Sequence, residues 1–283
     1  MSYAIYADAY KDENYSLCKD IASSLVARGE EVIVAHQQMV PEALYPHPQI
    51  HVDEDFLGKP VDALDQTTYP PELYADCEAF LSLGGDGTFL ATAHKAHYLD
   101  CPLVGVNLGS LGFMTEIDPE QMPQALDKLV AGDYTLQERM TLEVTLIKDG
   151  VPGKRYFALN DAVVNRGTVD RIVPVELSIN ARSSETNPWD GGIVSTPTGS
   201  TGYAMAAGGP IVDPSMELLQ ITPICPHSLH SRSYLVNSKD EISLSLAHEY
   251  KNSPLLSIDG RSAENLQAMH TRVVVKRGAQ NVK

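Results

Sequence analysis

Short apolar runs alternate with helix-like patterns over the first part of the chain. The runs at 2–7 and 31–35 have the length and the apolar content of buried strands. Between them, Leu17, Ile21 and Leu25 recur at the spacing of one helix face. This order predicts a strand, a helix and a second strand at the start of the chain.

The same alternation returns after a stretch rich in proline. Residues 37–71 contain six prolines and show little periodicity, so they predict a loop-rich connection without an assigned structure. Apolar strands are then predicted at 79–83 and 102–106, each followed by a helix, at 88–97 and 119–131. Strands that alternate with helices in this way predict a parallel sheet.

The pattern changes to a period of two after Gly132. Residues 141–147 alternate between apolar and polar positions, and long helical patterns disappear. Further short strands of this kind are predicted at 173–179, 241–246, 255–258 and 273–275. We therefore predict a Rossmann-like α/β domain over 1–132, followed by a β-rich, sandwich-like domain over 133–265.

Composition limits the ligands that this chain can attract. Hydrophobic residues make up 43% of the 283 residues and charged residues 20%, as in ordinary globular proteins. The 37 acidic and 21 basic residues give a formal charge of -16, which repels nucleic acids and anionic membranes. A phosphate site in this chain must therefore rest on local backbone N–H groups, a helix N-terminus or a metal ion.

Cysteine spacing and hydropathy indicate the cellular compartment in which the protein acts. The spacing of the cysteines predicts neither a zinc site nor a disulfide framework, and we predict no metal site made of the chain's own side chains. No stretch approaches the length of a membrane span, and the start of the chain does not read as a signal peptide. We expect a cytoplasmic protein with no nucleic-acid or membrane partner. The four cysteines are Cys18, Cys77, Cys101 and Cys225.

The strongest local signal is the turn Gly84-Gly-Asp-Gly87 between a predicted strand and a predicted helix. Glycines at such a turn let backbone N–H groups approach phosphate oxygens, although they also suit an ordinary tight turn. Asp86 favours the functional interpretation, because a carboxylate in an anion-binding loop must bind a metal, accept a hydroxyl hydrogen bond or take a proton. The chain contains no Walker A sequence, which excludes a P-loop enzyme.

Three further segments carry candidate chemistry. Residues 107–113 form a second glycine-rich loop after a strand, and ligands of parallel sheets bind at such strand ends. Asn160 and Asp161 can bind an adenine edge and a ribose, or form a simple turn. The segment 190–210 is rich in glycine and small hydroxyl residues, which suits a polar pocket with Tyr203 as a stacking ring.

The order of these motifs resembles the NAD kinase family. A lone GGDG would be weak evidence, since lipid kinases and phosphofructokinases carry similar sequences, but the ordered set is specific. It covers most of the chain from about 79 to 260. The matching segments are 84–88, 107–113, 159–161, 195–203, 208–211, 223–229 and 257–260.

The resemblance assigns roles to individual residues. It implies Asp86 as the catalytic carboxylate with Gly87 beside it in the phosphate loop. The other positions that it implies bind the nucleotide, and in the family some of them are completed by a neighbouring subunit. They are Asn160 and Thr201 at the adenine, Asp161 at the ribose, Tyr203 stacked on the adenine, Asp190 and Cys225 in the pocket wall, and Arg171, Gly202, Ala206 and Gly260. The chain departs from the family at Asp161, where glutamate is common, at Pro188, where a basic residue is common, and at Ala206, where serine is common.

The resemblance also implies an activity and an organisation. NAD would lie between the two domains, the first of which would be completed by the returning segment 266–283. The terminal phosphoryl group of ATP, another nucleoside triphosphate or polyphosphate would pass to the 2′-hydroxyl of the adenosine ribose, with Mg²⁺ or another divalent cation. The family implies a homo-oligomer, a tetramer or a dimer. The alternatives are a non-catalytic NADP(H) sensor and a lipid kinase of the same superfamily.

Overall fold

The computed structural model divides the chain into two compact units. The first contains the chain up to Gln137 together with Val282–Lys283, and the second contains Glu138–Asn281. No helix among the described residues is long and apolar enough to cross a membrane. The structure describes residues 1–35, 47–53, 72–109, 112–166, 173–182, 186–228, 230–246, 254–266 and 271–283.

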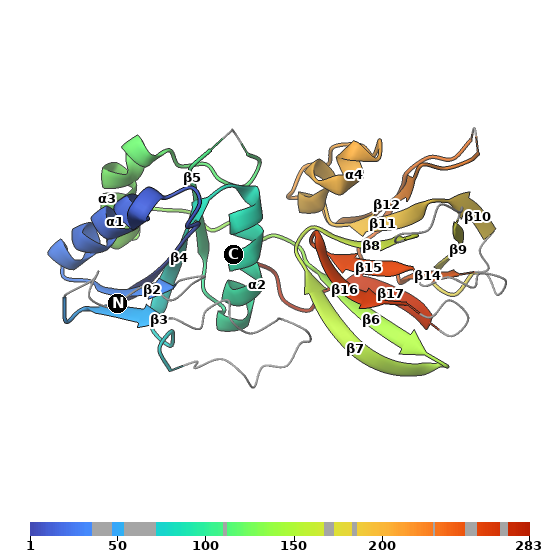
Figure 1. The fold of residues 1–283 in the computed structure, drawn as a ribbon, viewed down its shortest axis with the longest axis horizontal. Helices are drawn as coiled ribbons and strands as arrows, with labels where there is room; N and C mark the ends of the chain where they lie inside the picture. The colour runs from blue at the N-terminus through green and yellow to red at the C-terminus, as the bar shows by residue number, and fades with distance from the viewer. Residues whose placement is uncertain are drawn as a thin grey trace. The chain divides into compact units, whose positions relative to one another are not determined.

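The first unit is built on a parallel sheet of five strands (Figure 1). Every neighbouring pair in the sheet is parallel, as the alternation of strands and helices predicts. The strand that ends at Asp53 lies within residues 37–71, for which the sequence predicts a loop-rich connection without an assigned structure. In spatial order the strands are β3 (Ile50–Asp53), β2 (Glu31–Ala35), β1 (Ser2–Ala7), β4 (Cys77–Gly84) and β5 (Leu103–Asn107).

Helices cover both faces of this sheet, because its strands are apolar on both sides. The buried faces of α1 (Ser16–Ala27) and α3 (Met122–Ala131) pack in one core cluster with the strands. The helix α2 (Asp86–Leu99) contributes Ala96 to a second cluster on the opposite face. Leu25 and Leu126 are each about 2% exposed or less, so both helices of the first face bury an apolar stripe.

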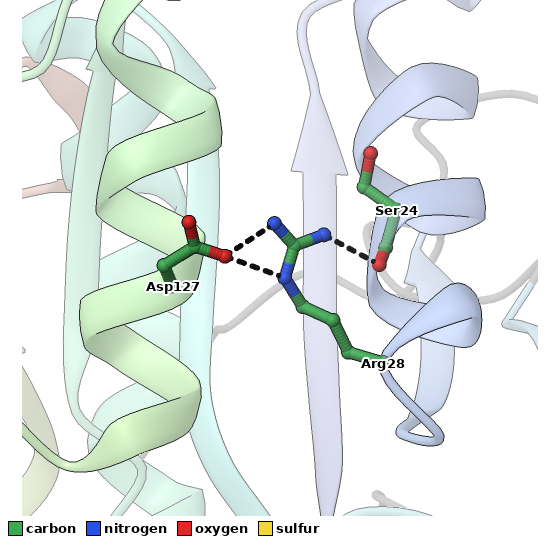
Figure 2. A network of polar contacts seen from close by, with 3 residues as sticks. All are labelled: Ser24, Arg28 and Asp127. Carbon is green, nitrogen blue, oxygen red and sulfur yellow. Dashed lines mark hydrogen bonds and ion pairs between the residues drawn. The ribbon is translucent and has the colours of Figure 1, made fainter.

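Local capping fixes where these helices begin and how they lie. The carboxylate of Asp12 accepts hydrogen bonds from the N–H groups of Leu17 and Cys18, at 3.0 and 2.9 Å, at the start of α1. At the other end of α1, Arg28 reaches across to α3, where its guanidinium donates two hydrogen bonds to Asp127 (Figure 2). The same guanidinium donates to the Ser24 carbonyl at 2.8 Å and so holds the last turn of α1.

The second unit contains two antiparallel sheets of six strands each. One sheet has the order β10 (Thr186–Trp189), β9 (Val173–Ile179), β14 (Ile242–Leu246), β17 (Thr271–Arg277), β6 (Leu142–Lys148) and β7 (Val151–Ala158). The other has the order β13 (Tyr234–Asn237), β12 (Leu218–Ile224), β11 (Gly191–Ser195), β8 (Asp161–Asn165), β15 (Leu255–Ile258) and β16 (Arg261–Asn265). One large cluster of buried side chains comes from both sheets, which makes the unit a sandwich as predicted.

The C-terminal segment belongs to the second unit, in contrast to the expectation for 266–283. Strand β17 lies between β14 and β6 and is hydrogen-bonded to both. Val273 and Val275, on one face of this strand, are buried in the sandwich core, as the apolar positions of an alternating strand should be. Only Val282–Lys283 join the first unit, where the Lys283 carbonyl accepts a hydrogen bond from Leu103 at 2.9 Å. The boundary between the units correspondingly falls after Gln137 and not at Gly132.

Candidate functional site

The GGDG turn stands at the carboxyl end of β4, where it leads directly into α2. Gly85 is the extended residue that precedes the helix, and Asp86 is the first helical residue. The first N–H groups of any helix have no partner within the helix, so they are available to an anion at this position. The hydroxyl of Thr88 donates to Asp8 at 3.0 Å and ties this first turn to the loop after β1.

The second glycine loop lies beside the first. Asn107 pairs with Gly84 in the sheet, and the Leu108 N–H donates to the Gly84 carbonyl at 2.7 Å. The Asp86 carboxylate accepts one hydrogen bond from the Phe113 N–H, at 2.9 Å, and one from the Met114 N–H, at 3.1 Å. The two loops predicted to share a crevice are therefore joined through the side chain of Asp86.

Gly112 gives the Asp86 carboxylate its space. A Cβ atom added at Gly112 would collide with both the carboxylate carbon and one of its oxygens. The backbone of this loop approaches the carboxylate more closely than any other residue type allows. Asp86 is half-buried, so its position is fixed by backbone groups while it keeps access to solvent.

The Asn160–Asp161 turn of the second unit rests on another carboxylate. Asp259 accepts hydrogen bonds from three consecutive backbone N–H groups, those of 159, 160 and 161, at 2.8, 2.8 and 2.9 Å. Its own N–H donates to the Asp161 carbonyl at 3.0 Å. Asp259 and Gly260 both have positive φ, in the two-residue turn between β15 and β16. This turn therefore holds the backbone of the predicted adenosine-binding residues.

The glycine-rich segment after β11 closes on the same turn. The Thr196 hydroxyl donates to the Leu159 carbonyl at 2.6 Å, and a Cβ atom at Gly199 would collide with the backbone of Asn160. A Cβ atom at Gly202 would lie 3.4 Å from the Asn160 amide nitrogen and 3.7 Å from an Asp161 carboxylate oxygen. The structure thus brings Asn160, Asp161 and Gly202 together.

Two polar atoms at this turn lack a partner among the described residues. The side-chain oxygen of Asn160 and the hydroxyl of Thr198 are buried without a hydrogen bond. Buried polar atoms are normally paired, because an unpaired one costs about 1–3 kcal/mol. Their position suits a ligand that supplies hydrogen-bond donors and acceptors.

Burial raises the pKa of Asp161 from 3.8 to about 7, and the neighbouring charge of Asp259 adds to this effect. The side chain is 4% exposed, so desolvation of the charged form is the larger cause. Asp259 lies beside it and accepts hydrogen bonds from three backbone N–H groups. Asp161 therefore changes its protonation state near neutral pH, next to a second carboxylate.

Asp190 and Cys225 do not lie at this turn. Ser195 pairs with Asp161 at one end of the β8–β11 ladder, whereas Gly191 pairs with Asn165 at the other end. At about 3.4 Å per residue, the two ends of the ladder are roughly 14 Å apart. Asp190 stands at the far end, where Arg166 contacts it at 3.3 Å and its N–H donates to the Ile224 carbonyl, next to Cys225.

The remaining predicted residues fall into three groups. Thr201, Tyr203 and Ala206 lie in the short helical segment that follows the Thr196 turn, and Tyr203 is 45% exposed. Gly87 and Gly260 adjoin the two carboxylates that order the loops, Asp86 and Asp259, and a Cβ atom on either glycine would meet no atom within 4 Å. Arg171 lies outside the described residues.

Comparison with known proteins identifies the family. Residues 159–283 match the family model described as the ATP-NAD kinase C-terminal domain, and residues 4–134 match the model described as the ATP-NAD kinase N-terminal domain. The chain belongs to the NAD kinase family. The NAD kinase of Lachnoclostridium phytofermentans is 37% identical over 99% of this chain and 92% of its own length. That of a Geobacter species is 36% identical over 91% of this chain and 84% of its own length.

Solved structures of the NAD kinase family share the fold. A yeast NADH kinase in complex with NADH has a TM-score of 0.81 at 22% identity and covers all of this chain and 82% of its own. An NAD kinase from Archaeoglobus fulgidus in complex with ATP has a TM-score of 0.69 at 23% identity, covering all of this chain and 92% of its own. Both likenesses support the parallel-sheet unit followed by the antiparallel unit.

Sequence reasoning did not assign a role to Asp259, although its motif contributed to the resemblance to NAD kinases. An Asp-Gly pair between two strands is also the ordinary sequence of a hairpin turn. The sequence alone therefore does not reveal the three N–H groups that donate hydrogen bonds to this carboxylate. The same holds for Gly112, whose role depends on the approach of Asp86 from a different loop.

Proposed function

We propose that this protein transfers the terminal phosphoryl group of ATP to the 2′-hydroxyl of the adenosine ribose of NAD, giving NADP. The observation that carries the proposal is the position of Asp86, which joins two glycine-rich loops at the carboxyl end of a parallel sheet. In such sheets ligands bind outside the carboxyl ends of the strands. A carboxylate among phosphate-binding loops is suited to a hydroxyl acceptor.

In this mechanism Asp86 orients the ribose hydroxyl and accepts its proton. The hydroxyl oxygen forms a bond to the terminal phosphorus, the bond from that phosphorus to the bridging oxygen breaks, and ADP leaves with the electron pair. The backbone N–H groups at the start of α2 hold the phosphoryl oxygens. The two N–H donors from Phe113 and Met114 fix the carboxylate, and most of the rate acceleration comes from positioning.

The second unit holds the adenosine. In this proposal Asn160 and Thr201 bind the adenine edge, Asp161 accepts from the ribose, and Tyr203 stacks on the ring. The unpaired side-chain oxygen of Asn160 supports this role, because it offers an acceptor to the adenine amino group. Gly202 lies close to both Asn160 and Asp161, where a larger residue would narrow the space for the nucleotide.

A divalent cation fits the donor site as part of the nucleotide complex. The described residues contain no group of three His, Cys, Asp or Glu side chains that would hold a metal by themselves. Mg²⁺ bound to a nucleotide keeps several waters and needs only one or two carboxylates besides the phosphates. Asp8 would provide such a carboxylate, which leaves Asp86 to accept the hydroxyl proton, and the ion would neutralise charge on the phosphates.

We also propose that the protein is a homo-oligomer, a tetramer or a dimer, that acts in the cytoplasm. Asp190 and Cys225 stand at the opposite end of the β8–β11 ladder from Asn160 and Asp161. Asp190 and Cys225 would then complete the nucleotide pocket of a neighbouring subunit, as the resemblance to the family implies. Light scattering at micromolar concentration tests this, since a fully active monomer would contradict it.

One assay separates the proposed reaction from its alternatives. Purified protein is given ATP and Mg²⁺ together with NAD, diacylglycerol or fructose 6-phosphate in parallel, and ADP formation is followed with a coupling enzyme. We expect turnover only with NAD, and formation of NADP in equal amount. Turnover with diacylglycerol would favour a lipid kinase. Binding of NADP without any turnover would favour a sensor.

A further inference from the structure

The loop after β1 brings one basic side chain to the GGDG turn. The chain runs from β1 outward to β2 and β3, and β4 then forms on the other side of β1. The change of direction between β1 and β4 is the point at which open parallel sheets bind their ligands. Lys11 lies in the loop at the carboxyl end of β1, and its backbone N–H donates a hydrogen bond to the Asp8 carbonyl at 3.0 Å.

The Lys11 ammonium lies against both glycine-rich loops. A Cβ atom on Gly85 would come within 2.6 Å of the ammonium nitrogen, and one on Gly109 within 3.4 Å. The absence of side chains at these two glycines therefore leaves room for this cation. It stands where the first glycine loop, the second glycine loop and the start of α2 meet.

The cation has no counter-ion of its own. Among the described residues the ammonium of Lys11 forms no ion pair and donates no hydrogen bond. The nearby carboxylate of Asp8 instead accepts from the Thr88 hydroxyl and the Tyr10 N–H, both at 3.0 Å. The sequence of 8–12, 84–88 and 107–115 contains no other lysine or arginine.

A local cation matters in a chain with a formal charge of -16. A nucleoside triphosphate carries about four negative charges, and the overall field opposes its approach. Helix N–H groups and a lysine ammonium together form a strong phosphate site. We propose that Lys11 binds the terminal phosphates of the phosphoryl donor and positions them for transfer. This inference rests on the proposed function and adds a residue to its donor site.

Binding without turnover provides the first test. The affinities of wild-type protein and of Lys11→Ala, Lys11→Arg and Lys128→Ala for ATP, ADP and AMP are measured by calorimetry without NAD. Lys128 is an exposed lysine of α3, so its variant makes the same change of charge outside the glycine loops. We expect Lys11→Ala to weaken the binding of ATP at least tenfold, that of ADP less, and that of AMP very little. The affinity of Lys11→Arg for ATP should stay within threefold of the wild-type value, and that of Lys128→Ala within twofold.

Steady-state kinetics provide the second test. Lys11→Ala should raise the KM for ATP at least tenfold and leave the KM for NAD within twofold. If Lys11→Ala binds ATP as tightly as Lys128→Ala does, the role of Lys11 is overturned. An equal loss of affinity for ATP, ADP and AMP would also overturn it. If ATP binding depends on Lys11 but NAD is not phosphorylated, the proposed function fails while the donor-phosphate site stands. Melting temperatures of all variants confirm that they fold.

Discussion

Each unit contains a loop that is ordered by one carboxylate, but the two carboxylates differ in their surroundings. Asp86 accepts two backbone N–H groups from a neighbouring loop and stays half-buried. Asp259 accepts three backbone N–H groups and stands next to a second carboxylate, that of Asp161. The first arrangement leaves a single carboxylate near solvent, whereas the second places a half-buried carboxylate next to the buried one of Asp161.

In the proposed mechanism, this difference separates the catalytic role of Asp86 from the binding role of the Asn160–Asp161 turn. A carboxylate that is fixed by backbone groups and still accessible can exchange a proton with a substrate hydroxyl. A carboxylate that accepts hydrogen bonds from three N–H groups of a turn has a structural role, so in the proposed mechanism Asp259 affects the nucleotide only through Asn160 and Asp161. Substitution of Asp86 should therefore change the rate, and substitution of Asp259 should change NAD binding and stability.

The largest effect is expected for Asp86→Asn. The amide keeps the shape and one acceptor oxygen, so one of the N–H groups of Phe113 and Met114 loses its partner, and the amide cannot take the proton of the ribose hydroxyl. Turnover should fall by about 10²–10⁴-fold, while the dissociation constant for NAD changes by less than threefold. Steady-state rates and calorimetry measure both quantities, and the exposed Asp20→Asn variant of α1 is the matched control. A variant that keeps more than about a tenth of the wild-type turnover, a loss under ~1.4 kcal/mol, would remove Asp86 from the mechanism.

The next effect concerns the pH dependence of stability at Asp161. Burial raises the folded-state pKa to about 7 from 3.8, so this group stabilises the fold below about pH 4 and loses that contribution as pH rises through 7. Relative to Asp161→Asn, the wild type should lose roughly 2–4 kcal/mol of unfolding free energy between pH 4 and pH 7.5. Urea unfolding of both proteins at several pH values measures this difference. Parallel curves would show that Asp161 titrates normally.

Asp259→Asn should weaken the binding of NAD without abolishing turnover. The amide nitrogen cannot accept a hydrogen bond, so at least one N–H of 159–161 loses its partner, at a cost of about 1–3 kcal/mol. We expect the KM for NAD to rise about tenfold, with a near-normal rate at saturating NAD. The control is Asp240→Asn, because Asp240 also accepts a turn N–H, that of Asn237 at 3.0 Å, at the β13–β14 turn. An equal rise of the KM for NAD in both variants would reduce the role of Asp259 to general stability.

The two units also differ in how far the sequence predicts them. Strands of the first unit are buried on both faces, so they appear as short continuous apolar runs between helical patterns. In the second unit, β7 contains Pro152 and Gly153, and β10 contains Pro188, which obscure the strand pattern. Both lie at sheet edges, where a proline removes no hydrogen bond of the ladder. Strand β12 is buried on both faces, so it shows no alternation.

The site shows the same limit. Asp86, Asn160, Asp161 and Gly202 were predicted from motifs, because their chemistry is contained in a few consecutive residues. The family resemblance assigns Asp190 to the pocket wall, and the antiparallel pairing of β8 and β11 places it at the other end of the ladder from Asn160 and Asp161, which the sequence does not reveal. Lys11 stands 74 residues before Gly85 in the chain, and only the parallel pairing of β1 with β4 brings the two together. Sequence motifs identify local chemistry, but contacts between strands depend on the register.

The smallest effect is expected at the link between α1 and α3 (Figure 2). Arg28 donates to Asp127 at 2.6 and 3.0 Å, but the Asp127 side chain is 69% exposed and that of Arg28 27%. Ion pairs that water reaches in this way contribute about 0–1 kcal/mol. Arg28→Ala should therefore lower the unfolding free energy by about 1 kcal/mol or less, part of it from the lost hydrogen bond to the Ser24 carbonyl, and leave the rate and both KM values within twofold. A double-mutant cycle with Asp127→Ala, measured by urea unfolding at low and high salt, isolates the pair. A coupling above 2 kcal/mol, or a loss of turnover in either single variant, would show that the packing of these helices controls the loops at the strand ends.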